Sequence, residues 1–300
     1  MSDVTVIGTG TMGSALVEAF AASGAEVVVW NRTREKAEAL AGPRVQVAAS
    51  AVDALAASPL TILAVTDHEL ARTIVEEAGL DLTGKVSAST SFVTPDQAQA
   101  FAAVVHAAGG HYLDLAIPAY PSEVRSGVGV FFVSGDRAGF EAHREHFEGI
   151  SRSSFVDGGP GVAFVSEMAV LLAYLPMAVG LAQGARICQR HGLSLEWYQA
   201  TVMELYPSQI RSLLDRVTEE ADRSATEVEA SVDVWGEGAR EYRAYLQELG
   251  LDTGMYEALE RLFRSAAEAG QGDAQWTVIA EHAATRERTR ATASRDQRSS

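Results

Sequence analysis

Short apolar runs alternate with helix-like segments over the first half of the chain. The runs are 4–8 (VTVIG), 25–30 (AEVVVW), 60–65 (LTILAV), 85–89 (KVSAS), 111–117 (HYLDLAI) and 127–135 (GVGVFFVSG). Between most of them lie segments with a helical repeat of apolar residues, such as SALVEAFAAS and TREKAEALA. Strands that alternate with helices build a parallel sheet covered on both faces. We therefore predict an α/β N-terminal domain with a doubly wound, mostly parallel sheet.

The pattern changes near residue 160, directly after the segment DGGPG. Beyond it the strand-like runs stop, and apolar residues repeat with a helical period almost to the end of the chain. We predict a sheet domain at 1–160, then a long interdomain helix and an all-α domain at 161–284. The last residues, 285–300, hold five Arg against one Asp and one Glu without apolar periodicity. This composition predicts a flexible tail.

The net charge and the cysteine content exclude several classes of partner and site. The net charge of −16 argues against nucleic acid and anionic membranes as partners. Pro176 and Gly180 interrupt the longest apolar stretch, Met168–Ala182, which we expect to fall short of a bilayer span. Cys188 is the one cysteine, which excludes an intramolecular disulfide and a thiolate metal cage. With no signal peptide visible in MSDVTV, we expect a soluble cytoplasmic protein without a bound metal.

Three glycines stand where the first strand runs into the first helix, in the motif GTGTMG. At such a junction Gly8 allows a tight turn, Gly10 lets the backbone approach a pyrophosphate, and Gly13 lets helix and strand pack closely. The N–H groups and dipole of the following helix favour an anion. The alternative is a structural turn without a ligand. We predict a dinucleotide-binding loop formed by Gly8, Thr9, Gly10, Thr11, Met12 and Gly13.

The end of the second strand indicates which dinucleotide is bound. A unit that binds NAD places an Asp or Glu here for the ribose 2′-hydroxyl. This chain has Asn31, Arg32 and Thr33, and Lys36 follows one helical turn later. Two cations and two hydrogen-bonding side chains suit a 2′-phosphate, which a carboxylate would repel. The predicted cofactor is therefore NADPH/NADP.

Four motifs, GTGTMG, WNRTREKAEAL, LAVTDHE and GGHYLDLAIPA, resemble the N-terminal domain of the β-hydroxyacid dehydrogenase superfamily. The chain is most similar to its NADPH-dependent imine reductases, over most of residues 4–190. The resemblance implies a Rossmann fold in which Val65 and Thr66 end a strand beside the cofactor. It also implies that Thr90 and Ser91, in SASTSFVTPDQ, contact the nicotinamide. Members of this family form dimers that exchange helices, with active sites between domains.

The start of the interdomain helix separates the branches of this superfamily. In the hydroxyacid dehydrogenases a catalytic Lys stands four residues after a Gly, with an Asn one turn later. Here Val165 and Ala169 occupy these positions after Gly161, and Val165 cannot transfer a proton. The imine reductase pattern, Gly, five residues, an acid, one residue, and Gly or Ala, fits Gly161, Glu167 and Ala169. The resemblance therefore implies that Glu167 stabilises an iminium charge or delivers a proton. Its alternative role is to favour the helix N-terminus.

We predict an NADPH-dependent reductase that transfers hydride to the C=N carbon of a small-molecule imine or iminium. The active site is expected between the domains of a domain-swapped homodimer. Leu171 and Tyr174 follow Glu167 by four and seven residues, so one helix face would present a carboxylate, an apolar surface and a phenol. Two alternatives stay open: a divergent β-hydroxyacid or aldehyde reductase that uses Tyr174 as its acid, and a non-catalytic NADP(H)-binding protein.

Overall fold

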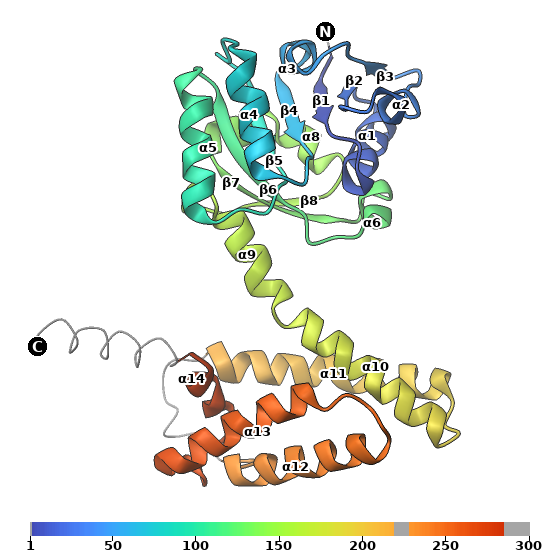
Figure 1. Cartoon of the computed structure of the whole chain (residues 1–300), viewed down its shortest axis with the longest axis vertical. Helices are drawn as coiled ribbons and strands as arrows, with labels where there is room; N and C mark the ends of the chain where they lie inside the picture. Colours follow the sequence, from blue (N-terminus) through green and yellow to red (C-terminus); the bar gives the residue numbers. More distant parts are fainter. Residues whose placement is uncertain (1, 219–227, 285–300) are drawn as a thin grey trace, which may run out of the picture. The chain divides into compact units, whose positions relative to one another are not determined.

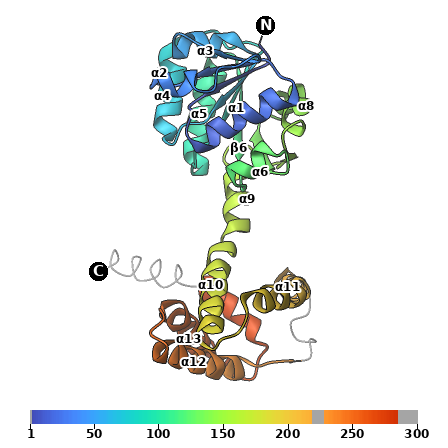
Figure 2. The same ribbon diagram turned by 90° about the vertical axis from the view of Figure 1, so that its right-hand side faces the viewer.

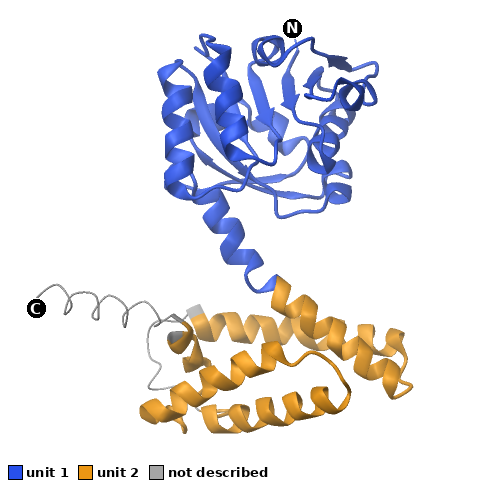
Figure 3. Cartoon of the chain, viewed as in Figure 1, with its two compact units in different colours: residues 1–174 blue, residues 175–300 orange. Residues whose placement is uncertain are grey.

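The computed structural model describes residues 2–218 and 228–284, which fall into two compact units, Met1–Tyr174 and Leu175–Ser300 (Figure 3). The predicted tail at 285–300 lies outside the described residues. The first unit extends past residue 160 because helix α9 (Val162–Leu171) packs against strands of its sheet.

The first unit is built on one eight-stranded sheet of order β3-β2-β1-β4-β5-β6-β7-β8. All neighbouring strands are parallel except β6 and β7, which are antiparallel. This arrangement confirms the predicted mostly parallel, doubly wound sheet. The strands are β1 (Val4–Ile7), β2 (Val27–Trp30), β3 (Val45–Val47), β4 (Leu60–Leu63), β5 (Val86–Ser89), β6 (His111–Ala116), β7 (Val130–Gly135) and β8 (Arg152–Phe155). Of these, β3 and β8 were not predicted from the sequence.

Helices cover both faces of the sheet (Figures 1 and 2). One face packs against α1 (Thr11–Ser23), α2 (Arg34–Glu38), α6 (Pro121–Arg125), α7 (Arg137–Ala142) and α8 (Arg144–Glu148). The other face packs against α3 (Ala51–Ala57), α4 (His68–Ala78), α5 (Pro95–Ala107) and α9. Continuous burial along β1, β4 and β5 is what a strand covered on both faces requires. The carboxyl ends of these strands are the edge at which open α/β sheets bind ligands.

The described part of the second unit is helical. Its helices are α10 (Tyr174–Arg190), α11 (Leu195–Thr218), α12 (Val232–Glu248), α13 (Gly254–Ala266) and α14 (Ile279–Ala284), with short π and 3₁₀ turns at Ala267–Gln271 and Trp276–Val278. A small core forms where α12 packs against α13 around Val232, Ala239 and Phe263. The all-α prediction for this part of the chain is confirmed. By contrast, the apolar residues of α10 and α11 lie mostly at the surface of the described chain.

The stretch Val162–Arg190, which contains α9 and α10, differs from its prediction. By length and composition it can span a membrane: the mean hydropathy of its most apolar window is 1.9, and only 11% of that window is buried. By length and composition alone, the expectation that this region falls short of a bilayer span was therefore wrong, since the stretch has 29 residues. An apolar surface of this extent requires a cover.

Candidate functional site

The loop between β1 and α1 has the geometry expected for a pyrophosphate. Gly8 adopts a φ of +103°, and a Cβ on it would collide with the Ala64 carbonyl. A Cβ on Gly13 would collide with the carbonyl of Gly8, so both positions need glycine for close packing. A Cβ on Gly10 would instead meet no atom within 4 Å in the part of the chain that the structure describes. The open side of the loop is therefore at Gly10, where the backbone can approach a ligand.

Two further features of this loop suit an anion. Helix α1 has no side-chain cap and no acidic residue in its first turn, which leaves its first N–H groups and its dipole for an external partner. The Thr9 hydroxyl is buried and has no hydrogen-bond partner among the described residues. An unpaired buried hydroxyl is costly unless a ligand or water completes it. The open cradle at Gly10 and the unpaired Thr9 hydroxyl together fit a dinucleotide phosphate.

Asn31 joins the glycine loop to the end of β2. Its side-chain oxygen accepts a hydrogen bond from the Thr9 N–H at 3.2 Å, and its Nδ2 donates to the Thr33 carbonyl at 2.9 Å. The amide is thus already paired on both sides. The sequence assigned Asn31 to the cofactor directly, whereas this geometry also gives it the task of holding two binding loops in register.

A cavity of about 270 Å³ lies beside this junction. Its lining comprises Trp30, Asn31, Arg32, Arg34, Val47, Ala48, Ala49, Ser50 and Ala51. Arg32, which the sequence predicts to bind a 2′-phosphate, is one of these residues. Arg34 also lines it but was not singled out, since its ion pair with Glu38 at 2.8 Å has the spacing of an ordinary surface pair. Lys36 is not among the lining residues.

The loops after β4 and β5 are tied together at the carboxyl edge of the sheet. The Ser91 hydroxyl donates to the Val65 carbonyl at 2.7 Å, and the Thr90 N–H donates to the Leu63 carbonyl at 3.1 Å. Ser91 is buried, Thr90 is half-buried and Thr66 is exposed. The Ser91 hydroxyl therefore fixes the loop, and the Thr90 hydroxyl also donates to the Leu63 carbonyl, at 3.4 Å. The predicted contacts of Thr66 and Thr90 with the cofactor stay predictions.

Glu167 lies on α9, which starts after Gly161 and ends at Leu171. Its side chain is half-buried and has no hydrogen bond or ion pair to any described residue. Burial raises the pKa of the Glu167 carboxyl above its ordinary value. A carboxyl that is partly withdrawn from water and unpaired holds its proton to higher pH, as a proton donor requires.

The sequence pattern placed Tyr174 on the same helix as Glu167, whereas the structure has a turn between the two residues. Helix α9 ends at Leu171 and α10 begins at Tyr174. Pro176 lacks an N–H and cannot donate to the carbonyl of Leu172, which accounts for the break. The Tyr174 hydroxyl instead lies 2.9 Å from that of Tyr120, which the sequence analysis had missed. Tyr120 precedes α6, and a contact so distant in sequence has no local signal.

Comparison with known proteins covers both parts of the chain. Residues 3–159 match the NAD binding domain of 6-phosphogluconate dehydrogenase, and residues 159–285 match the C-terminal domain of NADPH-dependent reductive aminase-like proteins. The chain belongs to the imine reductase family. An imine reductase from Myxococcus stipitatus, solved in complex with NADP+, is 28% identical with a TM-score of 0.83. The match covers 93% of this chain and 99% of that one.

Two other relatives of this imine reductase family member match little more than half of its residues. An NADPH-dependent reductive aminase from Aspergillus oryzae is 26% identical over 169 residues, which are 56% of this chain and 57% of the relative. The cytokine-like nuclear factor N-PAC of Aedes aegypti is 30% identical over 175 residues, 57% of this chain. The match spans only 31% of that longer protein.

Proposed function

We propose that this protein reduces the C=N bond of small imines or iminium ions at the expense of NADPH. The observation that carries the proposal is Glu167, an unpaired, half-buried carboxyl on α9 in a member of the imine reductase family. The same helix has Val165 and Ala169 where the resemblance to hydroxyacid dehydrogenases would require Lys and Asn. The Myxococcus relative, named an imine reductase and bound to NADP+, supports the proposal.

The residues present divide the work between binding and chemistry. The Gly8–Gly13 loop and the first N–H groups of α1 would hold the pyrophosphate of NADPH, and Arg32 would neutralise its 2′-phosphate. When bound, NADPH supplies hydride to the imine carbon, and the nitrogen gains a proton, so that imine gives amine. Glu167 donates that proton to a neutral imine, or as a carboxylate stabilises the positive charge of an iminium. Tyr174, hydrogen-bonded to Tyr120, is the second proton-bearing group.

The test is NADPH oxidation by the purified protein with three additions: a cyclic imine, a small aldehyde acid, and neither. The proposal predicts amine formation from the imine and little turnover of the aldehyde acid. Faster turnover of the aldehyde acid would favour the divergent hydroxyacid or aldehyde reductase. NADPH binding without turnover of either compound would identify a non-catalytic NADP(H)-binding protein.

We also propose that a second copy of the chain covers α10 and α11. No residue of α11 is buried among those described, and the two helices expose Leu175, Met177, Val179, Trp197, Met203, Leu205 and Ile210. Burying such a surface in a homodimer removes apolar area from water, and helix exchange in this family supports that arrangement. The net charge of −16 disfavours an anionic membrane as the alternative cover. A cytoplasmic location, where NADPH is supplied and Cys188 stays reduced, is part of this proposal.

Sedimentation velocity tests the dimer with a matched pair of variants. Met203→Glu on α11 and Val234→Glu on α12 alter residues that are 67% and 65% exposed. Met203→Glu should yield monomer and Val234→Glu should remain dimeric. Monomeric wild-type protein, or its co-sedimentation with neutral lipid vesicles, would overturn the proposed cover.

A further inference from the structure

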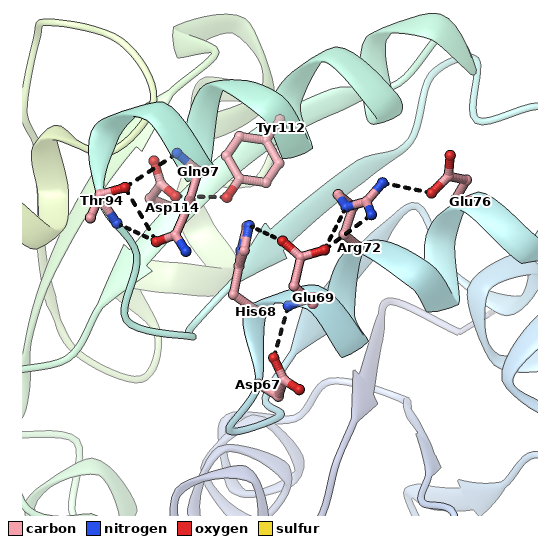
Figure 4. A network of polar contacts seen from close by, with 9 residues as sticks. All are labelled: Asp67, His68, Glu69, Arg72, Glu76, Thr94, Gln97, Tyr112 and Asp114. Atoms are coloured by element: carbon pink, nitrogen blue, oxygen red, sulfur yellow. Dashed lines mark hydrogen bonds and ion pairs between the residues drawn. The ribbon is translucent and has the colours of Figure 1, made fainter.

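Asp114 is a fully buried carboxylate in the middle of β6 that contacts the start of α9. One of its oxygens, Oδ2, accepts a hydrogen bond from the Gly161 N–H and another from the Ser134 hydroxyl at 3.2 Å. The other oxygen, Oδ1, accepts from the Tyr112 hydroxyl at 2.7 Å (Figure 4). A buried carboxylate is tolerated only when its oxygens are well paired.

Ser134 on β7 links Asp114 to a second backbone N–H group of α9. The Ser134 Oγ accepts a hydrogen bond from the Ala163 N–H at 2.9 Å, and the Ser134 hydroxyl donates its hydrogen to Asp114. The N-cap of α9 is Gly161, which has no side chain to receive the unpaired N–H groups of the first turn. Asp114 and Ser134, from two neighbouring strands, therefore perform the task that an N-cap side chain performs in most helices.

Close packing of Gly161 against Pro95 also fixes the start of α9. Gly161 adopts a φ of +91°, and a Cβ on it would collide with Cα of Pro95, the first residue of α5. Pro95 directly follows the hydroxyl-bearing loop that contains Thr90 and Ser91. The start of α9 is thus held between the sheet and the end of the loop predicted to lie beside the nicotinamide.

Glu167 depends on this anchor for its position. It has no hydrogen-bond or ion-pair partner among residues 2–218 and 228–284, and it stands six residues after Gly161 on a helix that rises about 1.5 Å per residue. We infer that Asp114, together with Ser134, is a positioning residue for Glu167, because it sets the origin and direction of α9. This inference rests on the proposed function of Glu167.

The test compares Asp114→Asn, which replaces a charged acceptor, with Ser134→Ala and with the control Thr5→Val. Thr5 is also buried in the sheet and bonds Ala54 and Ser58, but it does not touch α9. We expect Asp114→Asn to lower kcat for a neutral imine about 10–100-fold, since small displacements of a reacting group have effects of this size. Ser134→Ala should have a smaller effect in the same direction. The NADPH dissociation constant should change about twofold or less in either variant.

Two readouts separate positioning from general loss of stability. Hydrogen exchange at the Gly161 and Ala163 amides should become about tenfold faster or more in Asp114→Asn and stay unchanged in Thr5→Val. The basic limb of the kcat–pH profile should move to lower pH, because a displaced Glu167 loses the burial that raises its pKa. Ser134→Ala provides both readouts if Asp114→Asn fails to fold.

Two outcomes would overturn the inference. The first is a folded Asp114→Asn with wild-type kcat and wild-type exchange at the two amides. The second is a loss of NADPH binding in parallel with kcat. The proposed function fails separately: if Glu167→Gln alone reduces imines at the wild-type rate, Glu167 is not catalytic, whereas the exchange readout still reports on the anchor. If both hold, Asp114→Asn should add little to the kcat defect of Glu167→Gln.

Discussion

The phenolic oxygens of Tyr120 and Tyr174 lie 2.9 Å apart, although 54 positions separate the residues in the chain. Tyr120 is the N-cap of α6, and Tyr174 opens α10 directly after the helix break. The hydrogen bond to Tyr174 is the main cause that raises the pKa of Tyr120. The hydrogen bond between the two tyrosines therefore fixes the orientation of the Tyr174 phenol, which the proposed mechanism names as the second proton-bearing group after Glu167.

Tyr120→Phe should weaken catalysis by releasing this phenol. The ring is retained and only the hydrogen bond is lost, so we expect kcat for a neutral imine to fall about 3–10-fold with NADPH affinity unchanged. Tyr242→Phe, at an exposed tyrosine of α12, is the control. The effect should largely disappear when Tyr174 is already Phe. An additive loss in the double variant would show that the two phenols act independently.

Gly10→Val should abolish NADPH binding and leave the fold intact. A side chain at Gly10 meets no atom of the chain within 4 Å, so it projects into the space assigned to the pyrophosphate. We expect affinity to fall by about 100-fold or more, as measured by NADPH titration, with little change in the thermal melt. Gly42→Val is a matched control, because a Cβ there also meets nothing within 4 Å. Wild-type affinity in folded Gly10→Val would contradict the assignment of this loop.

Arg32→Ala should reduce the preference for NADPH over NADH. The loss of a hydrogen bond to a charged group should lower kcat/KM for NADPH about 10–100-fold and leave kcat/KM for NADH almost unchanged. Arg34→Ala should act in the same direction, since Arg34 lines the same cavity, and Lys36→Ala less so. Steady-state kinetics with both cofactors measure these ratios. A wild-type preference for NADH would make the cofactor assignment wrong.

The pH dependence of turnover should report the Glu167 carboxyl. Burial raises its pKa, so the protonated form that can donate persists to higher pH than for an exposed glutamate. As pH rises through that pKa the proton is lost, and kcat for a neutral imine should fall on the basic side. The Glu167→Gln variant should lose this limb of the profile. An unchanged limb in the variant would assign it to another group.

The period of the apolar residues and the spacing of the glycines were sufficient to predict much of the fold. The runs that became β1, β2, β4 and β7 are largely apolar, and those that became β5 (VSAS) and β6 (HYLDLA) mix apolar and polar residues; short runs of both kinds are typical of strands. In contrast, β3 has three residues and β8 reads RSSF, so neither presents an apolar run. The antiparallel direction of β7 has no counterpart in the alternation of strands and helices. The segment DRAGFEAHREHFEGI after β7 has a helical repeat of apolar residues, but His143 divides it into two short helices, α7 and α8.

The site was predictable where local backbone geometry decides it. The roles of Gly8 and Gly13 follow from close approaches that any loop of this spacing makes. Asp114 and Tyr120 were missed because their partners, Gly161 and Tyr174, are brought to them by the sheet and by α9 rather than by sequence spacing. The break between α9 and α10 was missed because the pattern did not account for Pro176.

The role of Glu167 is tested most directly by Glu167→Gln with two substrates, a neutral imine and a preformed iminium that needs no proton. The variant keeps the shape of the side chain and removes its charge and acidity, so NADPH affinity should barely change. If Glu167 is the proton donor, kcat should fall about 10²–10⁴-fold for the neutral imine and little for the iminium. If the carboxylate stabilises positive charge, both rates should fall. Wild-type rates with both substrates would contradict the account and leave Glu167 a residue that only favours the start of α9.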